Sequence, residues 1–333
     1  MSHLLSALRQ VFPGKPTFTE NDIPDLSGKV YIVTGANTGI GKEVARILYS
    51  KNAAVWIAAR NEEKARAAIA SIREEEAKAS SSSSGRLEFL RLDLGDLSTI
   101  KASAEAFLAR ESRLDVLFNN AGVMMPPRGS KTAQGHELQL GTNCLGPFLF
   151  TQLLTPTLVA TAAKTAATPK GSVRVVWVSS SAADILSPKG GVEMDNLDYK
   201  REVMYPYKYG ISKAGNYYHA TEYARRHRED GIVSVSLNPG NLKSELDRHC
   251  NWAELIFRKA TTYPTVNGAY TELFAGVSDQ VTLEKTGSWI VPWGRFENIR
   301  SDLQEGSKPA EEGGTGIAQK FWAWSEEQTS SFA

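Results

Sequence analysis

Cysteine is scarce in this chain, which has only Cys144 and Cys250 among its 333 residues. Two cysteines so far apart argue against a disulfide framework and against a cysteine zinc site, and they are typical of a reducing compartment. We therefore expect a cytoplasmic protein. The five histidines form no cluster of zinc-site spacing, so we also expect no metal.

The chain also lacks a strong charge imbalance and any long hydrophobic run. A formal net charge of +1 gives no general attraction for nucleic acid, so we expect no nucleic-acid partner. No apolar run approaches the roughly 18–20 residues that cross a bilayer, and no secretion signal is apparent. A few apolar residues near the start lie at helical spacing: Leu4, Leu5, Leu8, Val11 and Phe12. Such a segment could touch a membrane surface, but more often it packs on its own domain.

What the chain does contain is an alternation of strand-like and helix-like segments. Its 41% apolar and 23% charged residues are ordinary for a globular protein. Apolar runs rich in β-branched residues occur at 29–34, 54–59, 87–92, 114–118, 173–178, 232–237 and 287–291. Repeated strand–helix units predict an α/β fold, a Rossmann-type doubly wound parallel sheet with helices on both faces. Ligands bind beyond the carboxyl ends of such strands.

We find no internal repeat and no linker strong enough to divide the chain, so we expect a single domain. Residues 1–28 are interpreted as an N-terminal lead-in, 29–295 as the sheet domain and 296–333 as a C-terminal tail. Two segments of the domain, 182–208 and 244–260, mix polar residues with aromatic and aliphatic ones and interrupt the alternation.

Three glycines follow the first strand-like run, at Gly35, Gly39 and Gly41, and a helix-like segment begins directly after them. In this setting glycines permit a tight turn and let backbone N–H groups approach a phosphate at a helix N-terminus. Glycines in turns are often purely structural, but the strand-to-helix context favours a dinucleotide site.

The second strand-like run ends at Arg60. At this position an acidic residue would bind the ribose 2′-hydroxyl of NAD, whereas an arginine pairs with the 2′-phosphate of NADP. Arg60, with Lys64 one helical turn later, therefore predicts NADP(H); the alternative is a solvated arginine. Asp93 and Asn120 fall at the ends of the next two strands, on the same edge of the sheet.

Tyr209 and Lys213 are four residues apart in a segment of helical character. Residues at this spacing share one face of a helix, so a phenol and an ammonium would project together. A nearby cation favours the phenolate form of a tyrosine, which suits general acid–base catalysis on a substrate oxygen. The alternative is an ordinary amphipathic helix.

These patterns together resemble the short-chain dehydrogenase/reductase family. Four of its motifs occur in order: Thr34–Gly41, Asn119–Gly122, Tyr209-x-x-x-Lys213 and Asn238-Pro239-Gly240. Leu242 and Ser244 stand where the family usually has an aliphatic residue and a threonine. The Ala59-Arg60-Asn61 step resembles the retinol-dehydrogenase and WW-domain-oxidoreductase-like members from fungi, as does the long gap before Tyr209.

The resemblance implies a role for each catalytic residue. Tyr209 would exchange a proton with the substrate oxygen, and Lys213 would support it and hold the nicotinamide ribose. Ser180 would hydrogen-bond the substrate oxygen; Ser179 and Ser181 stay open as alternatives because the gap to Tyr209 is long. Asn143 would order a water in the proton path. The implied cofactor contacts are Gly35, Asn37, Thr38, Gly39, Ile40, Gly41, Arg60, Lys64, Asp93, Leu94, Asn120, Ala121, Gly122, Tyr209, Lys213, Pro239, Gly240, Leu242 and Ser244.

The function that follows is NADP(H)-dependent interconversion of a carbonyl and an alcohol. The segments 182–208 and 244–260 would line the substrate pocket, and their apolar content favours a bulky hydrophobic small molecule such as a polyketide, terpenoid, steroid, retinoid or lipid, although aromatic residues there can equally serve packing. A non-reducing isomerase or cyclase and a catalytically silent cofactor-binding protein are the alternatives. The resemblance allows a homodimer or a homotetramer, since the family often forms them, but it does not determine the oligomeric state.

Overall fold

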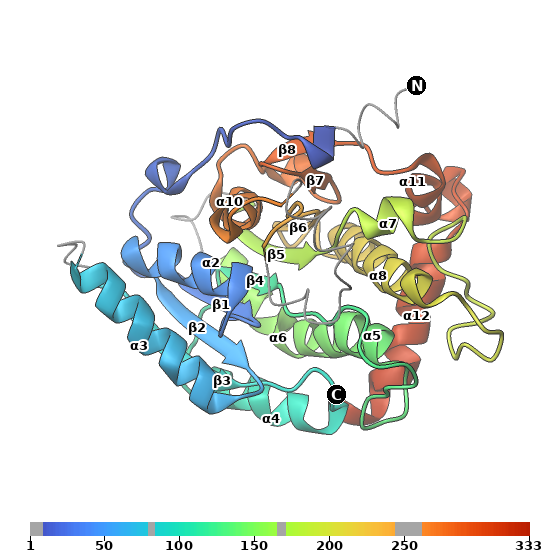
Figure 1. The fold of residues 1–333 in the computed structure, drawn as a ribbon, viewed down its shortest axis with the longest axis horizontal. Helices are drawn as coiled ribbons and strands as arrows, with labels where there is room; N and C mark the ends of the chain where they lie inside the picture. Colours follow the sequence, from blue (N-terminus) through green and yellow to red (C-terminus); the bar gives the residue numbers. More distant parts are fainter. Residues whose placement is uncertain (1–8, 79–83, 165–170, 244–261) are drawn as a thin grey trace.

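An eight-stranded sheet forms the centre of the molecule (Figure 1). The computed structural model describes residues 9–78, 84–164, 171–243 and 262–333. The strands are β1 (Val30–Thr34), β2 (Ala54–Ala59), β3 (Arg86–Arg91), β4 (Val116–Asn119), β5 (Val173–Val178), β6 (Ile232–Leu237), β7 (Trp289–Val291) and β8 (Arg295–Glu297). Their order is β3-β2-β1-β4-β5-β6-β7-β8, and all neighbours are parallel except β7 and β8. The expected α/β, Rossmann-type sheet is confirmed.

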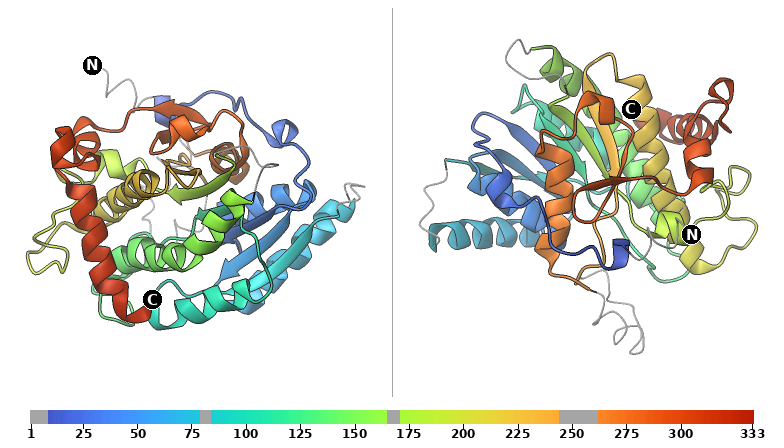
Figure 2. Two further views of the ribbon diagram at one scale, coloured as in Figure 1. Left: turned by 180° about the vertical axis from the view of Figure 1, so that it is seen from behind. Right: turned by 90° about the horizontal axis from the view of Figure 1, so that it is seen from above.

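Helices cover both faces of this sheet (Figure 2). One layer contains α2 (Gly39–Ser50), α3 (Glu62–Lys78) and α10 (Thr265–Val277). The other contains α4 (Leu97–Leu108), α6 (Gly146–Ala163) and α8 (Tyr205–Arg226), with α12 (Ile317–Thr329) packed on α8. The shorter helical elements are η1 (Glu20–Asp22), α5 (Leu138–Leu140), η2 (Gly141–Leu145), α7 (Ala182–Ile185), η4 (Leu283–Lys285), α11 (Ser301–Ser307), η5 (Ala310–Glu312) and η6 (Ser330–Phe332).

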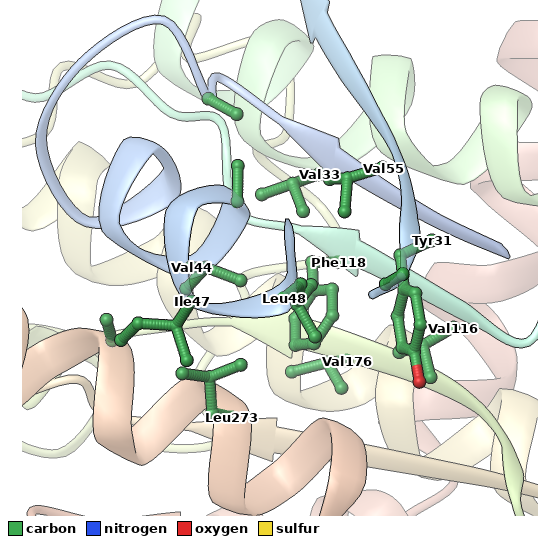
Figure 3. Close-up of a cluster of buried hydrophobic side chains, with 14 of the residues drawn as sticks. Tyr31, Val33, Val44, Ile47, Leu48, Val55, Val116, Phe118, Val176 and Leu273 are labelled. Atoms are coloured by element: carbon green, nitrogen blue, oxygen red, sulfur yellow. The ribbon is translucent and has the colours of Figure 1, made fainter. Parts of the chain in front are cut away.

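Successive side chains of a strand enter different layers of the core. On β1, Tyr31 and Val33 belong to the cluster that α2 and α10 cover, shown in Figure 3, whereas Val30 and Ile32 belong to the cluster that α4 and α6 cover. This alternation is the two-residue period of a strand. Because both faces are buried, the strand appears in the sequence as a continuous apolar run.

Three of the predicted strands, 54–59, 173–178 and 232–237, have the observed bounds of β2, β5 and β6. The segment 182–208 was expected to continue up to Tyr209, which is wrong at its end: α8 begins at Tyr205, so the last four residues of the segment are helical. Pro206 occupies the first turn of α8, where its missing N–H costs nothing, and it marks a helix start that the sequence pattern alone did not settle.

Both ends of the described chain contribute to the core. Phe18, Ile23 and Leu26 of the lead-in join the cluster beneath α2 and α10. At the other end α12 buries Phe321 and Trp322 against the sheet domain. Of the lead-in residues at helical spacing, three lie outside the described residues, Val11 is half-buried and Phe12 is exposed.

One helical stretch is long and apolar enough, by length and composition, to cross a membrane. It is Leu138–Ala163, which joins α5, η2 and α6, and 61% of its most apolar window is buried. Its side chains pack against the sheet and α4, as those of a core helix do.

Candidate active site

The glycine turn between β1 and α2 has the geometry that close approach of a ligand requires. Gly35 and Gly39 have φ angles of 69° and 60°, which favour glycine. A Cβ atom at Gly41 would lie only 2.5 Å from Nδ2 of Asn120. The residue before α2, Thr38, makes no side-chain cap, which leaves the first N–H groups of α2 for another acceptor.

Side chains of β1 and the β4 end hold this turn in place. Asn120 Nδ2 donates a hydrogen bond of 2.7 Å to the Thr34 carbonyl, and the Ala121 N–H donates one of 2.9 Å to Thr34 Oγ1. The predicted neighbours Gly35 and Asn120 are therefore in contact, as expected for residues at the carboxyl ends of adjacent parallel strands.

The cations predicted to select NADP lie at the end of β2. Arg60 directly follows β2 and is exposed, and Lys64 is exposed in the first turn of α3. Asn61 accepts a hydrogen bond of 2.8 Å from the Lys64 N–H, which fixes the start of α3. At the end of β3, Asp93 accepts a bond of 2.9 Å from the Gly95 N–H, and Leu94 is buried. The four predicted cofactor residues Arg60, Lys64, Asp93 and Leu94 therefore lie on the sheet edge that carries the glycine turn.

The residues after β6 lie on the same edge. Pro239 is buried, and a Cβ at Gly240 would meet the Trp293 ring at 2.8 Å. Leu242 is buried and forms an isolated parallel bridge with Tyr263. Ser244 and the segment 244–260 lie outside the described residues.

Tyr209 and Lys213 share the buried face of α8, as predicted from their spacing. Their side chains are 8% and 4% exposed, and Lys213 Nζ lies 5.7 Å from the centre of the Tyr209 ring. Nζ donates a hydrogen bond of 2.8 Å to the carbonyl of Val178, the last residue of β5. Burial lowers the pKa of Lys213 to about 8, since desolvation disfavours its ammonium form.

Asn143 lies in η2, a π-helical turn between α5 and α6. Single π turns of this kind are frequent at functional sites. The Asn143 side chain accepts a hydrogen bond of 2.8 Å from the Val123 N–H and donates one of 3.0 Å to Ser212 Oγ. A Cβ at Gly122 would lie 3.1 Å from Asn143 Oδ1 and 3.4 Å from Lys213 Nζ. Gly122, Asn143 and Lys213 therefore meet in one place.

The three serines after β5 have different surroundings. Ser179 is buried, and its Oγ donates a hydrogen bond of 2.7 Å to the Lys213 carbonyl. Ser180 is partly exposed, and its Oγ accepts a bond of 3.2 Å from the Ala182 N–H, which leaves its proton available. Ser181 begins α7 without capping it. The geometry therefore favours Ser180 among the three as the residue that could donate to a substrate.

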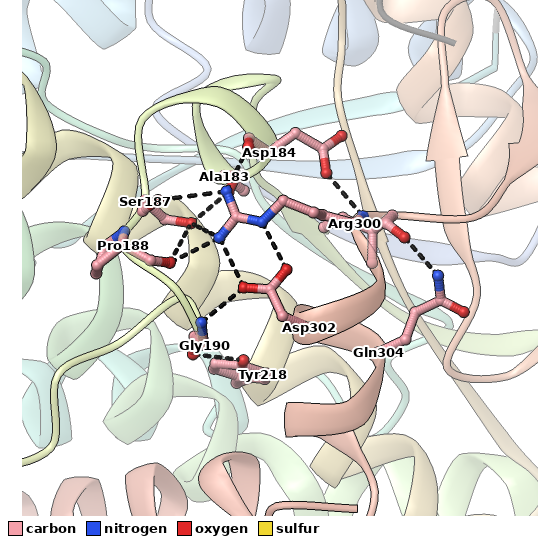
Figure 4. A network of polar contacts seen from close by, with 10 residues as sticks. Ala183, Asp184, Ser187, Pro188, Gly190, Tyr218, Arg300, Asp302 and Gln304 are labelled. Carbon is pink, nitrogen blue, oxygen red and sulfur yellow. Dashed lines mark hydrogen bonds and ion pairs between the residues drawn. The ribbon is translucent and has the colours of Figure 1, made fainter. Parts of the chain in front are cut away.

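A polar network fixes the start of the segment 182–208, as Figure 4 shows. The guanidinium of Arg300 donates to the carbonyls of Asp184, Ser187 and Pro188. It also pairs with Asp302, whose carboxylate accepts a bond of 2.6 Å from the Gly190 N–H. The chain just after the three serines is thus held by residues from the far end of the sequence.

Sequence analysis missed several residues of this network. Ser212 contacts Asn143, and Asn216 Nδ2 donates a hydrogen bond of 2.6 Å to the Asn143 carbonyl. Both lie on the buried face of α8 beside Tyr209 and Lys213, so their helical spacing was an available signal. Arg300 carried no such signal, since the carbonyls that it binds are more than 100 residues away in sequence.

The residues present fit a dinucleotide. The glycine turn offers a cradle that a Cβ at Gly41 would fill, beside a helix N-terminus without a side-chain cap. On the same sheet edge Arg60 and Lys64 offer exposed cations. Tyr209 and Lys213 offer a buried phenol and a buried amine. Among the described residues no group of histidine, cysteine and carboxylate side chains could hold a metal ion.

Comparison with known proteins gives consistent similarities. Residues 29–192 match the family model for short chain dehydrogenases. A short-chain dehydrogenase/reductase of Phomopsis amygdali is 55% identical over 334 residues, which cover 99% of this chain and 98% of the relative. Another, from Neocamarosporium betae, is 49% identical over 327 residues, which cover 97% of this chain and 92% of the relative.

Solved structures share the fold. An uncharacterised protein of Mycobacterium paratuberculosis superposes with a TM-score of 0.68 at 27% identity, over 94% of this chain and 97% of that chain. Pseudomonas aeruginosa RhlG, solved with NADP, gives a TM-score of 0.62 at 23% identity, over 83% of this chain and 97% of that chain. Because RhlG is only 23% identical to this chain, its likeness concerns the fold alone.

Proposed function

Since this chain belongs to the short-chain dehydrogenase/reductase family, it is an oxidoreductase with a nicotinamide cofactor, and we propose that it uses NADP(H) to interconvert a carbonyl and an alcohol. The observation that carries this proposal is that Lys213, whose Nζ lies 5.7 Å from the Tyr209 ring, meets Gly122 and Asn143 on the edge that bears the glycine turn. A cytoplasmic location is part of the proposal, since the chain has only two cysteines.

The proposed proton transfer uses the buried pair on α8. Tyr209 protonates the substrate oxygen during reduction, and Lys213, with its ammonium near the ring, favours the phenolate that this leaves. Ser180 donates a hydrogen bond to the same oxygen, because its proton is not used within the described chain. When bound, NADPH supplies the hydride to the carbonyl carbon.

The choice of NADP(H) over NAD(H) rests on Arg60 and Lys64. Both are exposed at the end of β2, where the second ribose of a dinucleotide is held in folds of this type. A guanidinium can bind a 2′-phosphate with two parallel hydrogen bonds. Among the described positions that directly follow β2, Arg60 and Asn61 take the place of the acidic residue that would favour NAD.

The proposed substrate is a bulky hydrophobic small molecule. Two large apolar side chains that lie in sequence between Ser180 and Tyr209 are exposed: Ile185 in α7 is 61% exposed, and Met204, just before α8, is 65% exposed. Both lie in the segment 182–208, which joins Ser180 to Tyr209. Apolar side chains that flank a polar reaction centre favour a substrate with a large apolar body, such as a polyketide, terpenoid, steroid, retinoid or lipid.

The proposal is tested by the consumption of NADPH with a panel of ketones and aldehydes of increasing apolar size. We expect turnover with bulky members and a loss of roughly 10²–10⁴-fold in the Tyr209→Phe variant. Tight NADPH binding without turnover on any carbonyl would instead identify a silent cofactor-binding protein. Conversion of a substrate without cofactor would identify an isomerase or cyclase.

A further inference from the structure

The start of the described chain reaches the sheet edge that carries the candidate site. Residues 9–14, which form a strap, lie beside β7 and β8 (Figure 1). Four hydrogen bonds join the strap to residues that follow β6, more than 200 positions later in the sequence. The proposed mechanism gives this segment no role, although it contacts the turn after β6.

The first of these bonds links the strap to the side chain that closes the turn. Nδ2 of Asn238 donates a hydrogen bond of 2.8 Å to Oε1 of Gln10, and the two residues are 3% and 6% exposed. Oδ1 of the same Asn238 accepts a bond of 3.1 Å from the Gly240 N–H. Because one amide group binds both partners, Gln10 helps to fix the conformation of the turn.

A tryptophan connects the strap to the backbone of the same turn. Gly240 has a φ angle of 99°, and a Cβ there would lie 2.8 Å from the Trp293 ring. Trp293 is 2% exposed, and its Nε1 donates a hydrogen bond of 3.0 Å to the Gly14 carbonyl. The ring that packs against Gly240 is therefore held in place by the strap.

A tyrosine does the same for the residues that follow the turn. The Tyr263 N–H donates a hydrogen bond of 2.8 Å to the Asn241 carbonyl, and Tyr263 forms the bridge with Leu242. Its hydroxyl donates one of 3.3 Å to the Val11 carbonyl. Its ring contacts that of Trp293 edge to face, with centroids 5.2 Å apart. The strap therefore holds this stretch of chain at three points.

The turn after β6 lies on the reactive side of the proposed cofactor site. In a doubly wound sheet each half of the strands binds one half of a dinucleotide, on either side of the point where the strand order reverses. Arg60 follows β2 in one half, whereas β6 pairs with β5 in the other half. The carbonyl of Val178, at the end of β5, binds Lys213. The strap thus supports the side that carries the proposed chemistry, away from the cations at β2.

We propose that the strap is part of the cofactor site and that Gln10 is its positioning residue: Gln10 holds the turn 238–240 in the form that receives the nicotinamide half of NADPH. Without this bond the turn would occupy several conformations, and binding would have to select the competent one, which lowers the apparent affinity. The inference rests on the proposed function for its effect on binding, whereas the support of the turn exists without cofactor.

The effect on binding is tested with Gln10→Met, which keeps the length of the side chain but removes the acceptor for Asn238. One such hydrogen bond is worth about 2–10-fold in an equilibrium constant, so NADPH should bind more weakly by that factor. Adenosine 2′,5′-bisphosphate lacks the nicotinamide half, so its affinity should stay unchanged. Titration calorimetry measures both affinities. An unchanged NADPH affinity, or equal losses for the two ligands, overturns the proposal.

Two variants serve as controls for this pattern. Ile23→Val alters another buried residue of the lead-in, 4% exposed, which packs in the cluster beneath α2 and α10. It should lower stability without changing either affinity. Arg60→Asp should weaken both ligands, because they share the 2′-phosphate. A loss of NADPH affinity in Ile23→Val equal to that in Gln10→Met overturns the proposal, since the effect would then follow from stability alone.

The support of the turn is tested separately by amide hydrogen exchange of the cofactor-free protein. Gln10→Met should speed exchange in residues 240–243 by at least about 2-fold, whereas Ile23→Val should leave it as in the wild type. Equal exchange in the wild type and Gln10→Met overturns the inference. A wild type that binds neither ligand would refute the proposed function instead. The exchange result does not depend on binding, so the two failures can be told apart.

Discussion

Ser179 Oγ donates a hydrogen bond of 2.7 Å to the backbone carbonyl of Lys213. This bond joins the end of β5 to the middle of α8. Each of the two elements positions one residue of the proposed mechanism: Ser180 follows β5, and Tyr209 lies on α8. A helix interior normally uses its carbonyls within the helix, so the side-chain donor adds a tertiary contact at Lys213.

Exchange of the neighbouring serines for alanine should separate structure from catalysis. Ser179→Ala leaves a buried contact unmade, and we expect it to lower the free energy of unfolding by about 1–2 kcal/mol. Ser180→Ala should leave stability within about 0.5 kcal/mol but lower kcat by roughly 10²-fold, since it removes a donor to the substrate oxygen. Urea unfolding and steady-state kinetics measure the two effects. A fall of kcat in Ser179→Ala but not in Ser180→Ala would show that Ser179, not Ser180, donates to the substrate oxygen.

Arg60→Asp should reverse the cofactor preference. It replaces a cation that can pair with the 2′-phosphate by an anion that repels it, so NADPH should bind at least about 10-fold more weakly and NADH more tightly. Cofactor titration by fluorescence measures both constants. Arg66→Gln is a suitable control, because Arg66 is exposed like Arg60 but lies on α3 and pairs with Glu62. Unchanged selectivity in Arg60→Asp would refute the assignment.

Gly41→Ala should disturb the cofactor turn through one contact. The new Cβ would lie 2.5 Å from Asn120 Nδ2, which must then leave the Thr34 carbonyl. We expect a loss of about 1–3 kcal/mol in stability and weaker NADPH binding. Asn120→Ala removes the obstructing amide, so adding Gly41→Ala to it should cost less than Gly41→Ala costs alone. Equal costs in the two backgrounds would show that another contact dominates.

The buried amine of Lys213 should make stability rise with pH in the alkaline range. Its pKa falls from 10.5 in the unfolded chain to about 8 in the folded one. Between these values the unfolded state binds more protons, so the free energy of unfolding increases, by about 3 kcal/mol over the whole window. Below pH 8 both states are protonated and the full penalty remains. Urea unfolding of the cofactor-free protein from pH 7.5 to 9.5 should show this rise in the wild type but not in Lys213→Met; parallel curves would contradict it.

Arg300→Lys should loosen the segment after the three serines. Lysine keeps the charge but cannot donate at once to the carbonyls of Asp184 and Pro188. We expect faster hydrogen exchange in residues 182–190 and a fall in kcat/KM of up to about 10²-fold, because small misplacements of a catalytic group are costly. Arg295→Lys serves as the control, because the guanidinium of Arg295 donates instead to the carbonyls of Pro292 and Arg9. Equal exchange in both variants would exclude the proposed role.

The sheet and the cofactor edge could be predicted because their signals are local. A strand buried on both faces is a continuous apolar run, which places β2, β5 and β6 at their observed bounds. Glycines at Gly35, Gly39 and Gly41 are needed by the backbone of one short turn. The spacing of Tyr209 and Lys213 is a property of a single helix.

The remaining features depend on contacts between distant segments. A glutamate is usually exposed, and only the packing of α10 on the sheet buries Glu272. The π turn at Asn143 depends on hydrogen bonds that no pattern predicts. Residues 296–333 were interpreted only as a tail, because the packing partners of Phe321 and Trp322 lie on other elements. The proposed substrate class stays a prediction.

The support that α12 gives to α8 has a consequence for synthesis of the chain. Phe321 packs against Gly215, and Ser325 bonds His219, so the back of the catalytic helix is completed by residues near the C-terminus. When only the first 300 residues have been synthesised, the chain contains the proposed nucleotide-binding half and Tyr209. It still lacks α12, which packs behind α8. We expect nascent chains to acquire cofactor affinity before catalytic competence, and chains that end between residues 310 and 316, before α12, to bind the dinucleotide without turnover.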